Sequence, residues 1–194
     1  MRISLASDHA GFPLKLAVKA WLIRQGHDVQ DVGCHSEQPV DWPDVIYPAA
    51  LALSEGRVDR AILIDGAGYP SCSLAAMLWN VAPAVGNDLV SARLAREHSN
   101  ANALCLGGKI IGEATALEAV RIFLETEFLG GKYAARLEKL NAIREKHVKG
   151  PGHVARRLIA LEDLRHALLN KESLVMDEKT ILTPGVLDLA NGIR

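Results

Sequence analysis

The sequence lacks the features that mark secreted, membrane-spanning and nucleic-acid-binding proteins. Its three cysteines are an odd number and show no CxxC spacing, so we expect free thiols in a reducing cytoplasm. Met1 leads directly into a strand-like segment, and no run of about 18 apolar residues occurs, so neither an export signal nor a transmembrane helix is expected. The net charge is −1 without a basic block, which argues against nucleic acid or a membrane surface as partner. The histidines show no metal-ligand spacing, so no metal is expected.

Short apolar segments alternate with helical patterns along most of the chain. The predicted strands span residues 2–7, 28–33, 61–64, 82–86 and 103–106, and the helices between and after them include 47–54, 71–79, 88–98 and 113–125. This alternation predicts an α/β fold with a doubly wound, mostly parallel five-stranded sheet (Rossmann-like) and helices on both faces. Functional sites are then expected at the carboxyl ends of the strands.

The last quarter of the chain has a different character. An amphipathic helix is predicted over 132–146, and the glycine–proline segment 149–152 favours a break. We therefore expect one domain over 1–148 and a helical C-terminal extension over 149–194. Within that extension, apolar spacing predicts a helix over 154–169 and a short helix after Thr183.

The fold is organised around a buried strand that leads into a glycine-rich turn. The apolar run 61–64 ends at Asp65, and Gly66, Ala67 and Gly68 follow. A carboxylate at this place is solvated in a cleft, paired, or hydrogen-bonded by nearby amides, so Asp65 is either a catalytic group or a helix cap. The turn either offers exposed N–H groups to an anion or a developing oxyanion, or serves only close packing.

Two histidines lie where they could join such a site. Asp8 and His9 follow the first strand as Asp65 follows the central one, so the two turns are expected to open on the same edge of the sheet. His98 ends the helix that contains RLAREH, where it serves either as a catalytic group or as a cation favoured by the helix dipole.

Several strings together resemble a known family. SDHAGFPLK, VDWP, SARLAREH, CLGGKIIG and FLETEFLGGKYAARLEKL are similar, in this order over about residues 1–148, to type B ribose-5-phosphate isomerases, a family that includes the subunits of galactose-6-phosphate isomerase. The resemblance implies an aldose–ketose isomerase of phosphorylated sugars that needs no cofactor or metal and works through an enediolate. It also implies a homodimer or homotetramer whose sites use residues of two subunits.

The resemblance also implies roles for individual residues. Asp8 would hold sugar hydroxyls, His98 would assist ring opening, and His9 would lie near the phosphate. Lys132 and Arg136 match two positions at which the family favours arginines for the phosphate. At Lys132, a guanidinium that binds phosphate through two N–H groups is therefore replaced by an ammonium group that acts as a point charge.

The departures from the family fall in the turn itself. Asp65 stands in place of the usual cysteine base, and Ala67 replaces a threonine between Gly66 and Gly68 in the turn that contacts substrate. Elsewhere, Trp42 takes the place of a pocket tyrosine, and Ser99 that of the asparagine after the histidine.

These departures leave three interpretations. First, the base is Asp65, whose pKa would need to be raised by desolvation, or Cys72, a thiol at a helix start whose alternative role is that of a small buried side chain. Second, the enzyme takes an altered tetrose or hexose phosphate. Third, the chain is a non-catalytic sugar-phosphate-binding or assembly subunit that a different subunit completes. The segment ILTPGVLDLA near the C-terminus resembles the terminal peptides of enzymes that are packaged in bacterial microcompartments, which implies attachment to such a shell. The apolar spacing over 154–168 supports the alternative, that the tail packs on a partner subunit.

Overall fold

The structure is a computed structural model that describes residues 1–148, 158–159, 181–182 and 186. Its contacts divide the chain into two compact units, Met1–Phe128 and Leu129–Arg194. The observed division lies before the amphipathic helix α6 (Lys132–Val148), so this helix belongs to the second unit. The predicted domain boundary between 148 and 149 stays a prediction.

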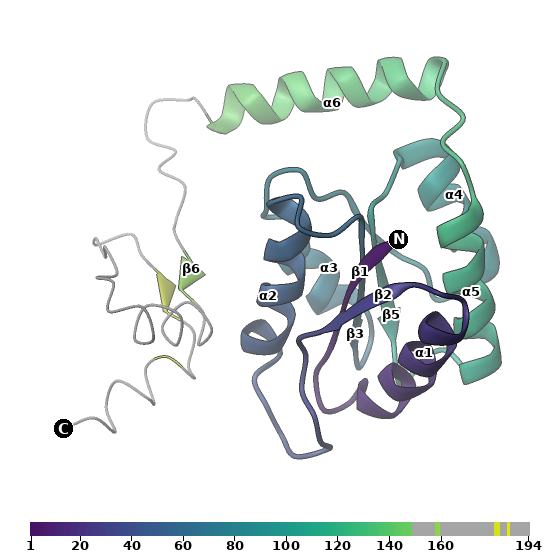
Figure 1. Cartoon of the computed structure of the whole chain (residues 1–194). Helices are drawn as coiled ribbons and strands as arrows, with labels where there is room; N and C mark the ends of the chain where they lie inside the picture. The colour runs from purple at the N-terminus through teal and green to yellow at the C-terminus, as the bar shows by residue number, and fades with distance from the viewer. Residues whose placement is uncertain (149–157, 160–180, 183–185, 187–194) are drawn as a thin grey trace. The chain divides into compact units, whose positions relative to one another are not determined.

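The first unit is built on one parallel sheet. Its strands are β1 (Arg2–Ser7), β2 (Asp28–Asp31), β3 (Arg60–Asp65), β4 (Pro83–Val85) and β5 (Ala103–Gly107), in the order β2-β1-β3-β5-β4 (Figure 1). Every strand pair is parallel. The central strand β3 is buried from Ala61 to Asp65, as its continuous apolar run predicts for a strand covered on both faces. The predicted doubly wound α/β fold is confirmed.

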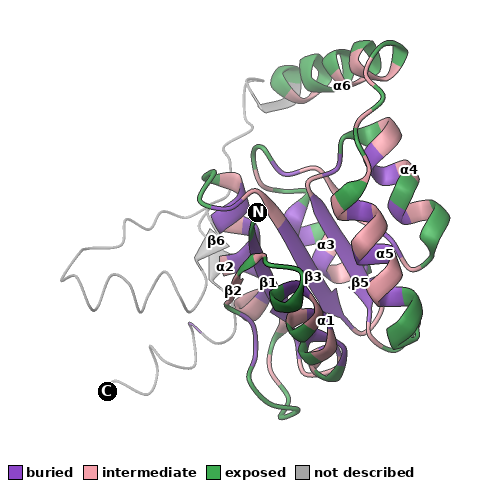
Figure 2. Ribbon diagram, turned by 45° about the vertical axis from the view of Figure 1, so that its right-hand side comes forward, coloured by how far each residue is buried: buried purple, intermediate pink, exposed green. Residues whose placement is uncertain are grey.

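Helices cover both faces of this sheet. They are α1 (Phe12–Arg24), α2 (Trp42–Ser54), α3 (Tyr69–Ala75), α4 (Leu89–Ser99) and α5 (Glu113–Glu125). The main core lies on the face of α1, α4 and α5, where side chains such as Val18, Ile62, Leu104 and Phe123 are fully buried. Figure 2 shows the central strands β3 and β5 coloured as buried. The short helix α3 packs beside α2 on the other face.

Some predicted bounds are wrong. Helix α2 begins at Trp42 and not at 47, because Pro43 lies in its first turn, where a missing N–H costs no hydrogen bond. Helix α3 ends at Ala75 and not at 79. Within the described residues, no helix is long and apolar enough to span a membrane.

The second unit contains α6 and two short strands. Helix α6 confirms the predicted helix over 132–146. The predicted helix over 154–169 is wrong at Leu158 and Ile159, which form β6 and pair in parallel with β7 (Ile181–Leu182). The β-branched isoleucines favour this pairing over a helix. The helix predicted after Thr183 lies outside the described residues except for Val186.

Candidate functional site

Three strands of the first unit end side by side at one edge of the sheet. In the observed register Ser7 lies beside Ile64, and Asp65 lies beside Gly107. The chain continues this register past β1, because the Asp8 amide donates to the Ile64 carbonyl at 3.1 Å. The prediction that the turns after β1 and β3 open on the same edge is therefore correct, and the turn after β5 joins them.

The Asp65 carboxylate is buried and fully hydrogen-bonded to the backbone. Asp65 is only 1% exposed to solvent. Oδ1 accepts hydrogen bonds from the amides of Ala67 at 2.8 Å and Gly68 at 2.7 Å, and Oδ2 accepts one from Ser71 at 2.9 Å. Asp65 therefore satisfies amides in the turn and in the first turn of α3, as a helix cap does. The expectation of exposed N–H groups is wrong for Ala67 and Gly68, because the chain supplies its own anion.

The turn lies directly against the end of β5. Gly68 has a φ of 85°, and a Cβ placed on it would lie 3.1 Å from the backbone carbon of Leu106. A Cβ on Gly107 would lie 2.7 Å from the carbonyl oxygen of Ala67. Glycine is required at both positions, because each backbone approaches the other more closely than a side chain permits.

One side chain that the sequence reasoning missed ties this turn to β5. The Asn87 side chain donates to the Ala67 carbonyl at 3.1 Å and accepts from the Gly107 amide at 2.7 Å. Asn87 follows Gly86 at the end of β4, so it lies at the same edge as the other polar residues. Its place directly after a strand is the signal that could have found it.

Two cysteines on neighbouring elements affect each other's ionisation. Cys72 on α3 is half-buried, and Cys105 is buried in β5. Interaction with the Cys105 thiol lowers the pKa of Cys72 from 9.0 to about 7, although burial and the charge of Asp65 act in the opposite direction. The same interaction and deep burial raise the pKa of Cys105. Cys72 is therefore the member of the pair that carries the thiolate near neutral pH.

Asp8, His9 and the start of α2 form the other side of the edge. Asp8 is 7% exposed, and its Oδ1 accepts from the Gly11 amide at 2.9 Å. His9 Nδ1 accepts from the Val40 amide at 3.3 Å. Val40 is two residues before Trp42, so the structure brings His9 close to the start of α2.

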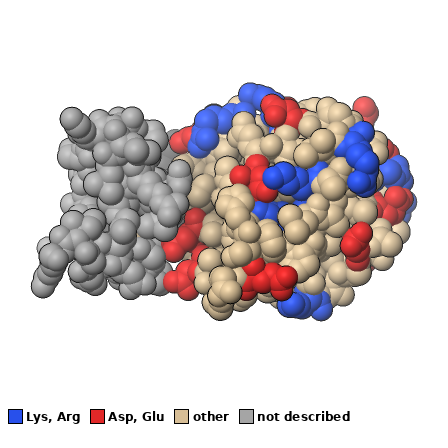
Figure 3. Space-filling model, turned by 60° about the horizontal axis from the view of Figure 1, so that its bottom comes forward, with Lys and Arg blue, Asp and Glu red and all other residues tan. Residues whose placement is uncertain are grey.

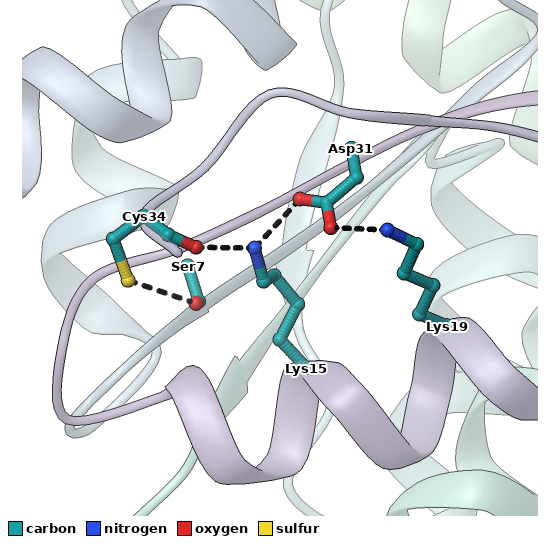
Figure 4. A network of polar contacts seen from close by, with 5 residues as sticks. All are labelled: Ser7, Lys15, Lys19, Asp31 and Cys34. Atoms are coloured by element: carbon teal, nitrogen blue, oxygen red, sulfur yellow. Dashed lines mark hydrogen bonds and ion pairs between the residues drawn. The ribbon is translucent and has the colours of Figure 1, made fainter. Parts of the chain in front are cut away.

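A buried lysine holds the loop that leads to α2. Lys15 on α1 is fully buried, and its Nζ donates to Asp31 Oδ1 at 2.6 Å and to the Cys34 carbonyl (Figure 4). Lys19 donates to the other oxygen of Asp31 at 2.8 Å. Burial raises the pKa of Asp31, but the two lysines outweigh it, so the pKa is lowered. Sequence reasoning missed this network, which fixes the start of the loop 32–41.

The first unit does not bring the remaining candidates to this edge. Helix α4 starts beside Asn87 and ends at Ser99, from which the chain enters the amino end of β5. The amide of Ala61, near the start of β3, donates to the carbonyl of Asn102, which directly precedes β5, at 3.1 Å. The starts of β3 and β5 therefore lie together at the amino edge of the sheet, opposite the carboxyl edge. His98 and Ser99 therefore lie at the amino edge of the sheet.

The two phosphate candidates lie on α6 of the second unit. Lys132 Nζ and Arg136 Cζ lie 5.1 and 5.5 Å from the centre of the Tyr133 ring on the same helix. Both residues are exposed. They are not among the groups that the first unit assembles at the carboxyl edge.

The rest of the described surface offers no stronger site. A hollow of about 450 Å³ between α4 and α5 contains none of the predicted residues; it is lined by Leu89, Val90, Arg93, Arg121, Ile122, Glu125 and Thr126. Basic and acidic side chains are interspersed on the face shown in Figure 3. In the part of the chain that the structure describes, no three His, Cys, Asp or Glu residues gather as metal ligands.

Comparisons with known proteins agree with this fold. A family model described as Ribose/Galactose Isomerase matches residues 3–140. The chain is 32% identical to ribose-5-phosphate isomerase B of Escherichia coli (75% of this chain, 97% of that protein) and 33% identical to D-erythrulose-4-phosphate isomerase of Pectobacterium atrosepticum (76% and 99%). The structure of ribose-5-phosphate isomerase B from Clostridium thermocellum matches with a TM-score of 0.73 at 37% identity, over 75% of this chain and 99% of that one. The chain belongs to the ribose/galactose isomerase family of sugar-phosphate isomerases.

Proposed function

We propose that this protein interconverts an aldose phosphate and a ketose phosphate by moving a proton between neighbouring carbons through an enediolate. The observation that carries the proposal is the carboxyl edge of the sheet, which brings Asp8, His9 and the start of α2 to the same edge as the turn that begins α3. Such a reaction needs a base, groups that orient the sugar hydroxyls, and cations for the phosphate.

Cys72 is the base in this proposal. Its pKa of about 7 gives a substantial thiolate fraction at neutral pH, which suits proton transfer from carbon. Asp65 is less suited to this role, because both of its oxygens already accept hydrogen bonds from backbone amides. Its role is to shape the turn and to start α3. Asp8 then orients sugar hydroxyls with its second oxygen, while Oδ1 remains on the Gly11 amide.

A second copy of the chain completes the site in this proposal. His98 and Ser99 lie at the amino edge of the sheet, opposite Asp65, so they serve the site of a neighbouring subunit. Lys132 and Arg136 on α6 supply the cations for the phosphate. A homodimer or a homotetramer built from such dimers satisfies this requirement, because a two-fold axis makes both sites equivalent.

Mixing two inactive variants tests whether the site is shared. Cys72→Ala and His98→Asn each remove one required group. Mixed dimers contain one site with both groups intact and one site with neither, so a random mixture recovers about a quarter of the wild-type activity. A site built within one chain gives no recovery.

The substrate in this proposal is a four- to six-carbon sugar phosphate. Relatives with 32% and 33% identity are named for ribose 5-phosphate and D-erythrulose 4-phosphate, which differ by one carbon. Ala67 has no hydroxyl to offer a sugar, and its carbonyl is bound by Asn87. We therefore propose a pentose phosphate as the preferred substrate and a tetrose phosphate as the second candidate.

Proton exchange in deuterated water tests the reaction directly. The protein is incubated with aldose and ketose phosphates of four, five and six carbons, and exchange at C1 and C2 is followed by NMR. We expect exchange with one chain length, abolished by Cys72→Ala and retained in part by Asp65→Asn. The reverse pattern assigns the base to Asp65.

One observation favours a second candidate function. The amides of Ala67 and Gly68 are bound to Asp65 and are not free for a substrate oxygen. A sugar-phosphate-binding or assembly subunit would tolerate this arrangement. Binding of a sugar phosphate without proton exchange, in the protein alone, would favour this second function over the isomerase.

A further inference from the structure

The imidazole of His9 makes one hydrogen bond within the described residues. Its Nδ1 accepts from the backbone amide of Val40 at 3.3 Å. A backbone amide can only donate, so Nδ1 carries no proton in this arrangement, and the proton of the neutral ring lies on Nε2. The partner of one ring nitrogen therefore decides what the other nitrogen offers.

The loop that carries Val40 is held at both ends by other contacts. At its start, the amides of Val32 and Cys34 donate to carbonyls of β1, each at 3.0 Å. At its end, helix α2 begins at Trp42, two residues after Val40. Because the loop is fixed to β1 and α2 in this way, the hydrogen bond from Val40 sets the imidazole of His9 and is not needed to hold the loop.

The second ring nitrogen of His9 is open to solvent. Nε2 has no hydrogen-bond partner in the part of the chain that the structure describes, and it does not belong to the buried polar atoms that lack one. His9 directly follows Asp8, whose amide donates to the Ile64 carbonyl at the carboxyl edge of the sheet. The Nε2–H group is therefore offered near the edge that carries the proposed function.

We propose that the Val40 amide fixes His9 as its Nε2–H tautomer, which makes His9 a hydrogen-bond donor to an oxygen of the bound sugar phosphate and excludes it as the base. In this tautomer the lone pair of the ring lies on Nδ1, where the Val40 amide already occupies it. Nε2 has a proton to donate but no lone pair with which to take one from carbon. Val40 is a positioning residue, because it contacts the imidazole and acts on the substrate only through it.

The tautomer of His9 can be measured without a substrate, although the inference rests on the proposed function for the identity of the ligand. In the full chain with isotope-labelled histidine, long-range proton–nitrogen correlation spectra distinguish protonated from unprotonated ring nitrogens. The spectra are recorded at mildly alkaline pH, where free histidine is neutral. We expect His9 to show a single form with its proton on Nε2, whereas His35, which is exposed on the same loop, shows the average of both tautomers.

Removal of the Val40 amide tests its role directly. A backbone ester at position 40, made with the α-hydroxy acid analogue of valine, removes the N–H group and keeps the side chain. We expect the His9 signals to move toward the average seen for His35. The chain offers a matched control, because the Gln38 amide of the same loop donates to Ser36 Oγ, also at 3.3 Å. An ester at position 38 removes a comparable bond and should leave His9 in the Nε2–H form.

Two substitutions of His9 separate a donor from a base. In His9→Asn the side-chain oxygen can replace Nδ1 as acceptor for Val40, but nothing replaces Nε2–H; in His9→Gln the longer side chain brings an N–H group toward the place of Nε2. Neither amide can take a proton at neutral pH. We expect the dissociation constant of ribose 5-phosphate, measured by calorimetry, to rise about tenfold or more in His9→Asn and clearly less in His9→Gln, with proton exchange retained in His9→Gln.

Three results would overturn the inference. The first is a His9 signal with the proton on Nδ1, and the second is an unchanged His9 signal in the position-40 ester. The third is an equal loss of proton exchange in both His9 variants with binding retained, which would identify His9 as the base. If no sugar phosphate binds or exchanges, the proposed function fails, while the spectra still decide whether the Val40 amide sets the tautomer of His9.

Discussion

Replacing Cys105 by alanine is expected to move the pH profile of the enzyme. The interaction with Cys105 is the main cause that lowers the pKa of Cys72 from 9.0 to about 7, whereas burial and Asp65 both raise it. Without the Cys105 thiol only the raising causes remain, so the pKa of Cys72 returns to its ordinary value or above. The thiolate fraction at pH 7 then falls from about one half to about one hundredth, which is roughly fiftyfold.

The assay is kcat/KM measured from acid to alkaline pH. Its acid limb reports the pKa of the essential base in the free enzyme. We expect the limb to move from near 7 to 9 or higher in Cys105→Ala, with activity recovering at alkaline pH. Cys105→Ser keeps a hydroxyl donor and is expected to show a smaller shift. An acid limb that stays near 7 in a folded Cys105→Ala variant would refute the assignment of Cys72 as base.

Asp65→Asn gives a shift of opposite sign. The charge of Asp65 raises the pKa of Cys72, so its removal is expected to lower the acid limb. The variant also leaves the Ser71 amide facing an amide nitrogen in place of a carboxylate oxygen, which costs about 1–3 kcal/mol of the free energy of unfolding. Urea denaturation measures the second effect. An acid limb that rises in Asp65→Asn would contradict the predicted electrostatic coupling.

The remaining predictions concern packing around the site. Lys15→Met is expected to lower the free energy of unfolding by about 2–4 kcal/mol at pH 7, because Asp31 loses a buried partner. The pKa of Asp31 is lowered in the folded state, so the stability that ionised Asp31 contributes is present above its ordinary pKa of 3.8 and is lost as the pH falls through its folded-state pKa. Melting curves from pH 7 to 3 should therefore show a weaker loss of stability with acid in Lys15→Met than in wild type. Gly107→Ala is expected to lower kcat strongly, since its Cβ would lie 2.7 Å from the carbonyl oxygen of Ala67. Gly112→Ala is the control, because no atom lies within 4 Å of its Cβ, and equal losses in both variants would contradict this reasoning.

The fold was predictable from local patterns. The continuous apolar run before Asp65 and the alternation of short strands and helices determine a parallel sheet with its turns at one edge. The positions of Asp8 and Asp65 at that edge follow from the same rule. Helix bounds were less predictable, since the start of α2 at Trp42 depends on a proline in its first turn.

The internal contacts of the site were harder to predict. The sequence indicates a carboxylate beside a glycine turn, but not that Asp65 accepts hydrogen bonds from three amides of its own chain. Cys72 and Cys105 are 33 positions apart, and only the packing of α3 on β5 lets Cys105 lower the pKa of Cys72. In the sequence Lys15 resembles any lysine on the surface of a helix, because its burial depends on the loop after Asp31, which is distant along the chain.

The hydrogen bonds of Asp65 have a consequence for ligand competition. A carboxylate attached to the backbone a few residues away is a tethered ligand, and its effective concentration at the amides of the turn is set by the chain itself. A phosphate or enediolate oxygen would have to displace this ligand before it could bind the amides of Ala67 and Gly68. The amides of Ala67 and Gly68 are thus already occupied when a free anion arrives.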